Sequence, residues 1–450
     1  MANQPSHKYR RAFLRAAERD MMDMSNTIYD VVIVGTGAAG LYCALNLPED
    51  LHICMITKQK ADESDSFLAQ GGMCVLRGEE DFAPYFEDTL RAGHYENDPK
   101  TVEVMIRSSN SVARDLLRYG VRFSRDEEGE LNYTKEGAHS CPRILFYEDV
   151  TGREITSKLL QAVRQRPNVV ILEDTTMIDL ACADNICGGV VVCTAQGERQ
   201  LLRAKDVVLA CGGLGGLYQN STNFSHITGD ALAIALRHGI EVSHLDYVQI
   251  HPTTLYSKKP GRRFLISESV RGEGAILMDK AGNRFTNELQ PRDLLSKALW
   301  AQMEKDGTDF VWEDLRPIGK EEILSHFPNI YQHCLEEGYD VLKEPIPVVP
   351  AQHYLMGGIK VDLASRTSMD RLYACGETSC NGVHGKNRLA SNSLLESLVF
   401  AQRAADDILF GERRPAQPAC QVDWKDYDDL DTLFAGYRQT VLDEIERKRA

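Results

Sequence analysis

The chain has 450 residues, 43% of them hydrophobic, which leaves room for two or three domains with ordinary globular cores. Its formal net charge of -15 argues against a general nucleic-acid or anionic-membrane surface, and no apolar segment reaches the roughly 18 residues that span a bilayer. The twelve cysteines form no C-x-x-C pair and no zinc-like pattern, so we expect reduced thiols, no metal site and a cytoplasmic location.

The first 28 residues differ in composition from the rest. Several arginines among apolar positions would suit a short amphipathic helix, but Glu18, Asp20 and Asp23 weaken any likeness to a mitochondrial presequence. We interpret residues 1–28 as an N-terminal extension that packs on the surface or frays.

A dinucleotide fingerprint follows. Residues 31–34 are four consecutive apolar residues, as in a buried parallel strand, and Gly35, Gly37 and Gly40 then open into an apolar helical pattern. Gly35 suits the tight turn, Gly37 allows backbone amides to approach a pyrophosphate, and Gly40 allows close packing of helix and strand. The alternative is a glycine-rich turn in an α/β core.

The second strand is predicted over residues 51–58. It ends in Thr57 and Lys58, where many dinucleotide folds place an acidic residue for the ribose. Gly71 and Gly72 come next and suit close backbone approach to a flat ring or a phosphate, although alone they would pass for an ordinary turn.

A surface helix is predicted over residues 99–120, followed by a polar stretch at 133–144. That stretch contains Glu136, His139 and Arg143, and composition alone favours a solvated loop.

Further strands and helices alternate up to residue 246. We expect a helix over 153–165, strands over 169–173, 188–194 and 204–210, and a helix over 230–236 with Asp230 in its first turn. The glycine-rich run at 206–216 would suit a second approach of backbone to a dinucleotide.

The pattern changes between Tyr247 and Pro350 to scattered strands, turns and polar motifs, which indicates an inserted domain. Residues 280–283 look like a hairpin turn. The first domain resumes near Gln352, and a helix follows Ser393. We therefore divide the chain into an N-terminal extension, a discontinuous nucleotide-binding domain, an inserted domain and a truncated C-terminal helical segment (1–28; 29–246 with 351–410; 247–350; 411–450).

Several motifs occur in a specific order: GTGAAG, AQGG, HPT, RGEGA, PRD, CGE and NRLASNSLLES. In this order they resemble the succinate dehydrogenase and fumarate reductase flavoprotein family, from about residue 29 to 410. The resemblance implies an α/β fold: a Rossmann-like FAD-binding domain interrupted by an α+β capping domain that closes over the flavin, with a short C-terminal helical tail.

Two positions point to one branch of that family. Members that attach FAD covalently use a histidine six residues before the first glycine of AQGG, and here that residue is Asp65, so the resemblance implies non-covalent FAD. Glu136 lies in EGAHS, which resembles the EGGHS stretch of the L-aspartate oxidases. A carboxylate suits the ammonium group that aspartate has and succinate lacks.

The resemblance also implies roles in catalysis. His251, His353 and Arg388 would bind the two substrate carboxylates, although a buried histidine taken singly more often satisfies a backbone carbonyl. Arg292 would transfer a proton. Glu268 and Arg271 would continue its proton path, or else form a surface ion pair.

The resemblance also implies a set of FAD-binding residues, which begins at the fingerprint and ends at residue 394. They are Thr36, Gly37, Ala38, Ala39, Gly40, Lys58, Ser66, Gly71, Gly72, Asp230, Glu377, Ser393 and Leu394. Glu377 would supply the ribose carboxylate that the second strand lacks.

The implied reaction is the FAD-dependent oxidation of L-aspartate to iminoaspartate, the first step of NAD biosynthesis through quinolinate. Oxygen or fumarate would reoxidise the flavin, and quinolinate synthase is a candidate partner. A soluble fumarate reductase that also oxidises succinate is the enzyme alternative, and an electron-transfer subunit docked on an iron–sulfur protein is the alternative from another class. Many L-aspartate oxidases have a longer C-terminal helical domain than this chain.

Overall fold

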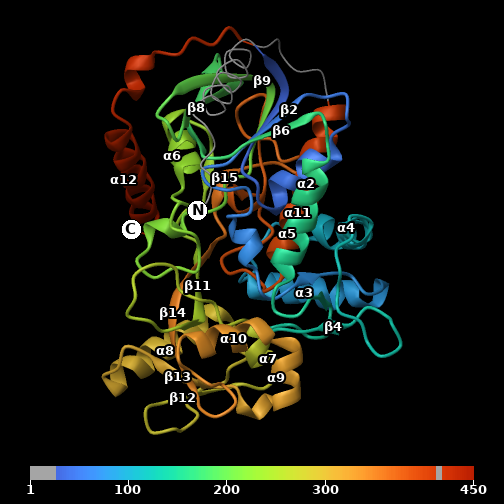
Figure 1. Cartoon of the computed structure of the whole chain (residues 1–450), viewed down its shortest axis with the longest axis vertical. Helices are drawn as coiled ribbons and strands as arrows, with labels where there is room; N and C mark the ends of the chain where they lie inside the picture. Colours follow the sequence, from blue (N-terminus) through green and yellow to red (C-terminus); the bar gives the residue numbers. More distant parts are fainter. Residues whose placement is uncertain (1–26, 412–417, 450) are drawn as a thin grey trace, which may run out of the picture.

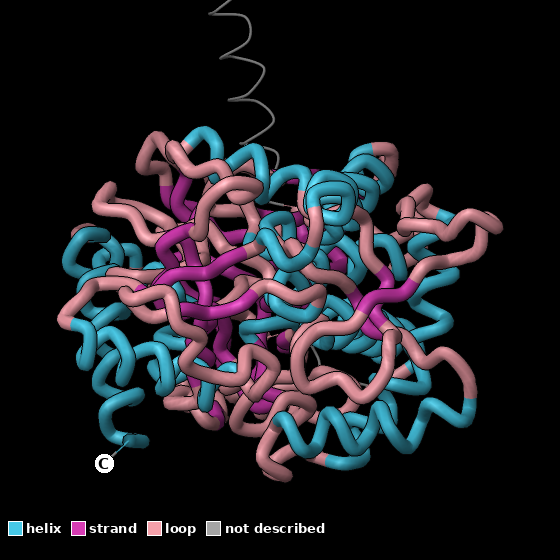
Figure 2. Tube along the Cα trace, turned by 90° about the horizontal axis from the view of Figure 1, so that it is seen from below, coloured by secondary structure: helices cyan, strands magenta, loops and turns pink. Residues whose placement is uncertain are grey.

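The structure is a computed structural model that describes residues 27–411 and 418–449. Nearly all of the expected N-terminal extension, residues 1–26, therefore lies outside the described residues. Figure 1 shows a large sheet flanked by helices in the upper part of the molecule and a smaller sheet with its own helices below. In the view from below, in Figure 2, strands lie in the interior and helices line the periphery.

The large sheet has the strand order β6-β2-β1-β9-β8-β7, and β16 pairs with the second half of β9. Strands β6, β2, β1, β9 and β16 are parallel, whereas β8 and β7 form an antiparallel extension. The bounds are β1 Ile28–Val34, β2 Ile53–Ile56, β6 Val169–Leu172, β7 Thr175–Ala183, β8 Ile186–Thr194, β9 Arg199–Leu209 and β16 Leu372–Ala374. The predicted strands are present, and β7 is an additional strand.

Both faces of this sheet are covered, which explains the unbroken apolar run of β1. Val31 and Ile33 pack in one core with helices α2, α4, α5 and α11, while Val32 and Val34 pack in a second core with α6 and α12. Alternate residues of a strand point to opposite faces, so a strand buried on both sides has no polar alternation. The helices are α2 Ala38–Asn46, α3 Phe82–Ala92, α4 Pro99–Arg118, α5 Thr151–Arg164, α6 Asp230–Arg237, α11 Asn392–Phe410 and α12 Leu430–Arg449.

The lower part is built on a four-stranded sheet of order β11-β14-β13-β12. Its bounds are β11 Val248–Leu255, β12 Ile276–Met278, β13 Val311–Asp314 and β14 Ile346–Leu355, and its helices are α7 Glu268–Gly272, α8 Arg292–Asp306, α9 Lys320–His326 and α10 Pro328–Glu336. A separate apolar cluster fills this part. The chain enters it through β11 and leaves through β14, and these two strands pair antiparallel.

Two short sheets complete the fold. Strands β3 (Met73–Cys74), β5 (Ile144–Leu145) and β4 (Tyr133–Thr134) form one, and β10 (Val242–Ser243), β15 (Gly358–Lys360) and β17 (Ser379–Cys380) form the other. The predicted hairpin turn at residues 280–283 is confirmed, because Asp279 and Asn283 share a backbone hydrogen bond of 2.9 Å. All twelve cysteines lie in the described ranges and are free thiols, as expected.

The C-terminal segment packs on the large sheet beside α6 (Figure 1). Tyr437, Val441 and Ile445 of α12 are buried in the same core as α6. The Tyr427 hydroxyl donates to Asp179 Oδ2 at 2.9 Å, and His238 Nε2 lies 2.6 Å from Asp179 Oδ1. The hydrogen bond to Asp179 is the main reason that the pKa of His238 is raised to about 9.

Among residues 27–411 and 418–449, no helix is both long and apolar enough to cross a bilayer. The same residues contain no group of histidine, cysteine and carboxylate side chains that could hold a metal ion.

Candidate active site

A large cavity begins at the carboxyl ends of β1 and β2 and extends to the β11–β14 pair. Most of the residues singled out from the sequence line it. The exceptions are Gly40, His139, Arg143 and Arg271, which are not part of the lining.

The three fingerprint glycines have different roles. A Cβ on Gly35, at φ +115°, would lie 2.1 Å from the Ala210 carbonyl oxygen, and a Cβ on Gly40 would lie 2.1 Å from the Gly35 carbonyl oxygen. These two positions need glycine for the packing of β1, β9 and α2. A Cβ on Gly37 would face the cavity with its nearest neighbour, Ser66 Oγ, at 3.2 Å.

Lys58 lies just after β2 and binds groups at the start of α6. Its ammonium group donates to Asp230 Oδ2 at 2.5 Å and to the His226 carbonyl and the Thr228 hydroxyl, each at 3.0 Å. Asp230 is in the first turn of α6, where the helix dipole favours a carboxylate. The pair therefore joins the end of β2 to the start of α6 at the cavity wall.

Two carboxyl groups face the cavity on its other wall. Glu377 Oε1 accepts the Leu355 amide at 2.9 Å, and Asp65 Oδ1 accepts the Phe224 amide at 2.9 Å. Burial is the main cause that raises the pKa of Glu377 to about 8 and that of Asp65 to about 7. Gly213, in the second glycine-rich turn, leaves room for Glu377, because a Cβ there would lie 2.2 Å from Glu377 Oε1.

The cavity wall carries buried polar atoms that have no partner within the described residues. They are Ser64 Oγ, Asp65 Oδ2, Gln70 Oε1 and His251 Nε2. Buried polar groups are nearly always hydrogen-bonded, so these atoms indicate a polar ligand. Together with the glycine turn and the start of α2, they fit a bound dinucleotide.

Glu136 is buried at the inner end of the cavity, with 4% of its surface exposed. Its Oε1 accepts the Ser269 hydroxyl at 3.0 Å and its Oε2 accepts the Ser391 hydroxyl at 2.5 Å. Burial, and then the charge of Glu268, raise the pKa of Glu136 above its ordinary value, while Arg292 opposes the shift. Ser391 has a left-handed backbone at φ +61° just before α11, a conformation found at functional sites.

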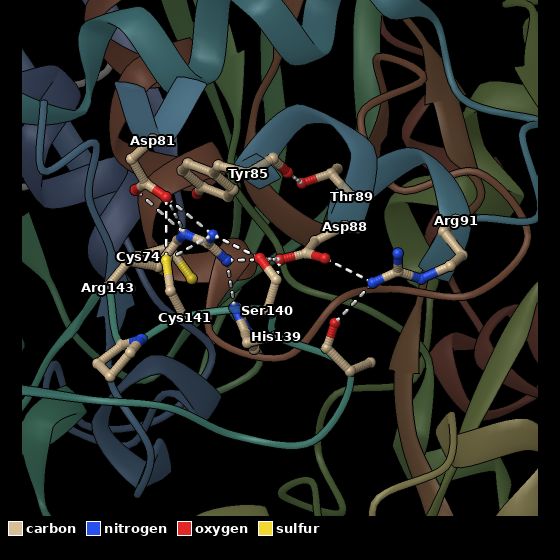
Figure 3. Close-up of polar contacts among 12 residues, drawn as sticks. Cys74, Asp81, Tyr85, Asp88, Thr89, Arg91, His139, Ser140, Cys141 and Arg143 are labelled. Atoms are coloured by element: carbon tan, nitrogen blue, oxygen red, sulfur yellow. Dashed lines mark hydrogen bonds and ion pairs between the residues drawn. The ribbon is translucent and has the colours of Figure 1, made fainter. Parts of the chain in front are cut away.

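The loop that carries Glu136 is not solvated, so the expectation from its composition was wrong. Arg143 is fully buried and binds two carboxylates, Asp81 at 2.9 Å and Asp88 at 2.8 Å, as Figure 3 shows. His139 Nδ1 lies 3.1 Å from Arg143 Nη1 and its Nε2 lies 3.1 Å from the Ala390 carbonyl oxygen, next to Ser391. Burial and the Arg143 charge lower the pKa of His139 to about 4, so the imidazole is neutral. This network fixes the loop against α3 and the start of α11.

Arg292 and Glu268 form a buried ion pair in the lower part of the molecule. Arg292 Nε donates to Glu268 Oε2 at 2.5 Å, and Arg271 Nη2 lies 3.9 Å from the same oxygen. Burial would raise the pKa of Glu268, but Arg292 and Arg271 outweigh it and hold the pKa below its ordinary value. The three groups are thus a buried chain, and the surface ion pair considered from the sequence is excluded.

The two histidines lie on the paired strands β11 and β14. Their ring centroids are 5.1 Å apart, and the pKa of each is far below its ordinary value, mainly because of burial. His353 Nδ1 lies 2.7 Å from the Thr222 hydroxyl. Register shifts on either side of Ile250–His251 disturb the β11–β14 ladder, as bulges beside active sites do. Both rings are therefore neutral groups that can donate one hydrogen bond each.

Arg388 reaches the cavity from the segment before α11. Its guanidinium lies 4.2 Å from the centre of the Tyr354 ring and donates to the Ser393 hydroxyl. Burial and the charge of Arg292 lower its pKa to about 10, so it remains a cation at neutral pH.

Four hydrogen-bonding residues of this site were not among the predicted site residues: Thr222, Gln249, Ser269 and Ser391. The Gln249 amide oxygen accepts hydrogen bonds from Arg292 Nη1 at 2.8 Å and from Arg388 Nε at 3.3 Å, so it bridges the two guanidinium groups. Ser391 lies inside the NRLASNSLLES motif, and Gln249 and Ser269 lie two residues before the HPT and RGEGA motifs, whereas Thr222 had no signal in the sequence.

The chain matches the family described as FAD binding domain over residues 30–394. It is 48% identical to the L-aspartate oxidase of Clostridium perfringens, over 94% of this chain and 95% of that protein. The chain belongs to the L-aspartate oxidase branch of this FAD-binding family. The resemblance seen in the motifs is confirmed.

Other members of the branch and several solved structures agree. Identity is 42% to the L-aspartate oxidase of Neisseria meningitidis, over 86% of this chain and 79% of the relative. Among structures, the FrdA chain of a mutant E. coli quinol fumarate reductase has a TM-score of 0.81 at 31% identity, covering 92% of this chain and 74% of that one. The Sdh1 chain of Mycobacterium smegmatis has a TM-score of 0.74 at 29% identity, covering 90% and 72%. The α/β flavoprotein fold and FAD as the family's cofactor are therefore confirmed.

Proposed function

We propose that this protein oxidises L-aspartate to iminoaspartate with non-covalently bound FAD, as the first step of NAD biosynthesis through quinolinate. The names of its relatives support the reaction. Free thiols at all twelve cysteines suit a cytoplasmic enzyme.

The observation that carries the proposal is a carboxylate next to a cluster of cations and neutral donors. Glu136 shares the cavity with Arg292, Arg388 and the two histidines. L-Aspartate has two carboxylates and one ammonium group, so its charges complement this set. Succinate and fumarate lack the cation, so neither can form a charge-assisted hydrogen bond with Glu136.

We assign the carboxylate contacts to Arg388, His251 and His353. A guanidinium can hold a carboxylate through two parallel hydrogen bonds, and neutral imidazoles add directional donors. Tyr354 and Gln249 hold the Arg388 guanidinium in place before substrate arrives. His251 Nε2 has no partner among the described residues and is available to the substrate.

The glycine turn, the start of α2, Lys58 with Asp230, and Glu377 would hold FAD, with Ser66, Gly71, Gly72, Ser393 and Leu394 around it. FAD, when bound, would supply the acceptor for the hydride that leaves the substrate Cα. The Arg292 guanidinium would orient a carboxylate and stabilise negative charge. In the reverse direction, with fumarate, Arg292 would deliver a proton to the substrate carbon and would be reprotonated through Glu268 and Arg271. Asp65, which cannot form a histidyl linkage, supports non-covalent binding.

The first experiment is an anaerobic titration of the purified holoenzyme. L-Aspartate should bleach the flavin band near about 450 nm and yield an imine that hydrolyses to oxaloacetate, while succinate should leave the band unchanged. Bleaching by succinate and not by aspartate would overturn the proposal.

A soluble fumarate reductase is the second candidate, because the fold matches the quinol fumarate reductase chain and Arg292, Glu268 and Arg271 form a connected proton path. Turnover of fumarate by the reduced enzyme is compatible with both readings, since fumarate can reoxidise the flavin in place of oxygen. Steady-state rates with L-aspartate under air and under nitrogen with fumarate identify the working acceptor. Isolation of a stable complex with an iron–sulfur protein would favour an electron-transfer subunit instead, and co-purification would test quinolinate synthase as a partner.

A further inference from the structure

A second, small cavity lies beside Glu136, between the upper and lower parts of the molecule. It shares Gln70, Gly71 and Ser267 with the lining of the large cavity, and its wall also includes Ser269, Glu273 and His326. Its polar wall and small size suit about one water molecule with several hydrogen-bond partners.

The two serines that bind Glu136 lead in different directions. The Ser391 oxygen accepts the Gly72 backbone amide at 3.1 Å, and an amide does not relay protons. Ser269 lies on the wall of the small cavity, and its hydroxyl also contacts the Ser267 hydroxyl at 3.2 Å. A hydroxyl both donates and accepts, so Ser269 can receive a proton on one side and release one on the other.

The far end of the small cavity reaches solvent through an ion pair. His326 Nδ1 lies 2.8 Å from Glu273 Oε2, and 36% of the His326 side chain is exposed. The hydrogen bond to Glu273 raises the pKa of His326 above its ordinary value. Glu322 adds to the field at His326, and Glu148 and Asp149 line the cavity from the opposite side.

We propose that Ser269, the small cavity and the Glu273–His326 pair carry away the proton that leaves the substrate ammonium group. In this step an N–H bond of the ammonium breaks and its proton moves to Glu136. The freed nitrogen lone pair forms the C=N bond while the Cα hydrogen leaves as hydride to FAD. The proton on Glu136 then passes through Ser269 and the cavity to His326, and from there to solvent.

This path is separate from the one through Arg292. Arg292 and Arg271 hold Glu268 as a carboxylate. These three groups therefore serve proton transfer at Arg292, and none of them is assigned to the substrate nitrogen. Oxidation of succinate or reduction of fumarate releases no proton from nitrogen. A defect in the proposed path should therefore slow the reaction with aspartate alone. The inference rests on the proposed aspartate oxidation.

The test compares His326→Ala and Glu273→Gln with matched controls in the same part of the molecule. His333→Ala removes a half-buried histidine that stacks on Phe264, and Glu337→Gln removes a charge paired with Lys259; neither residue lines the small cavity. For each holoenzyme we would measure anaerobic flavin reduction by L-aspartate in H2O and D2O, and fumarate reduction by the reduced enzyme.

We expect flavin reduction by aspartate to slow about tenfold in His326→Ala and Glu273→Gln, less than the loss of a direct general base causes. The solvent isotope effect on flavin reduction should rise in both variants, and the rate of fumarate reduction should change less than about twofold. Imidazole added to the buffer should restore the rate of flavin reduction in His326→Ala. The two controls should behave as the unmodified protein.

Equal losses in both reactions, or no loss with aspartate, would overturn the path. Ser269→Ala and Ser269→Thr provide a second check, because only threonine keeps the hydroxyl. If the unmodified enzyme is not reduced by aspartate, the proposed function itself fails. If that enzyme is reduced and the variants match it, only the path fails.

Discussion

At the scale of single residues, the site combines the Glu136 carboxyl group, held by hydroxyls, with the Arg292–Glu268 ion pair, the Arg388 cation and two neutral histidines. Glu136 is held by two serine hydroxyls from different parts of the chain, and Gly71 leaves room for it, since a Cβ there would lie 2.5 Å from Glu136 Oε1. The carboxylate is thus fixed before substrate binds, and reorganisation costs little.

Glu136→Gln should separate the two reactions. The amide keeps the size and can still bond to the serines, but it loses the charge that faces the substrate ammonium group. We expect kcat/KM for L-aspartate to fall about 100-fold, the order of a charge-assisted hydrogen bond. Fumarate reduction should change less than about threefold. The control is Glu396→Gln, which changes a buried carboxyl group in α11. Equal losses of Glu136→Gln in both reactions would contradict the role of Glu136.

Substitutions of two fingerprint glycines should have different effects, one on stability and one on FAD binding. Gly35→Ala forces a Cβ against the Ala210 carbonyl at a positive φ, so the protein should lose folding yield and thermal stability. In Gly37→Ala the methyl group would contact only the Ser66 hydroxyl closely, at 3.2 Å, and a small shift of that side chain relieves the contact. The apoprotein should therefore melt almost normally, while its dissociation constant for FAD rises about tenfold or more. Circular-dichroism melting and flavin fluorescence titration measure the two effects, and normal FAD binding by Gly37→Ala would show that this turn does not contact the cofactor.

The sequence predicted most charged residues of the site, because each lies in a short motif with a known chemical purpose. It did not predict the hydrogen bonds that hold them. Gln249 and Arg388 are 139 positions apart, and Glu136 and Ser391 are 255 apart. Such contacts depend on how the two parts of the fold meet, and no local pattern encodes them.

At the scale of elements, helix α10 is capped by a residue from outside its own part of the fold. Its N-cap residue, Phe327, has no capping side chain. Asp149, from the segment just before α5, accepts the backbone amides of Asn329 at 3.2 Å and Ile330 at 2.6 Å, and the Asn329 side chain at 2.8 Å. A carboxylate at a helix N-terminus is favourable, so this contact joins the two parts of the molecule.

Asp149→Ala should therefore loosen the start of α10. Loss of an N-cap costs about 1–2 kcal/mol, and amide hydrogen exchange at Asn329 and Ile330 should accelerate accordingly. Asp149→Asn keeps an acceptor oxygen and should lose much less. Unchanged exchange in Asp149→Ala would show that the cap contributes nothing to the stability of α10.

The predicted elements were most accurate where a buried apolar run has clear ends, as in β1 and α4. Strand β7 was not predicted, because Asp179 interrupts its apolar residues, and that carboxylate is buried only because His238 and Tyr427 reach it from elsewhere. The loop at 133–144 was predicted to be solvated for the same reason: Arg143 looks like a surface residue until Asp81 and Asp88 are placed around it.

At the scale of the whole molecule, the C-terminal segment is tied to the large sheet by a cluster that includes a titrating group. His238 has a folded pKa of about 9 against an ordinary value of 6.5, owing mainly to Asp179 and then Cys182. A raised pKa means that the folded state holds the proton more tightly. The stabilisation is therefore complete below about pH 6.5 and is lost as pH rises through about 9.

His238→Gln should make the stability of the protein less dependent on pH in this range. The melting temperature of the unmodified protein should fall more steeply between about pH 6.5 and 9 than that of the variant, because only the former releases this proton. His52→Gln, which replaces an exposed histidine, is the control. Parallel profiles for His238→Gln and the unmodified protein would contradict the assignment.

The division of the chain into a nucleotide-binding part and an inserted part remains a prediction at the level of exact boundaries. The large sheet, the separate core of the lower part and the return of the chain through β14 agree with it. The inserted part was recognisable because its motifs interrupt a βαβ pattern.

The pairing of β11 with β14 has a consequence for the order of events in catalysis. The inserted part is joined to the rest of the chain by this one ribbon, and His251 and His353 lie on the ribbon itself. A bend at the ribbon would swing Arg292, Glu268 and Ser269 outward as one unit and leave Arg388 and Glu136 behind, with Ser391 still bonded to Glu136. Arg388 and Glu136 would then be in place before the substrate arrives. Arg292 would complete the site only once the substrate is seated, so that water is excluded only when the site is full.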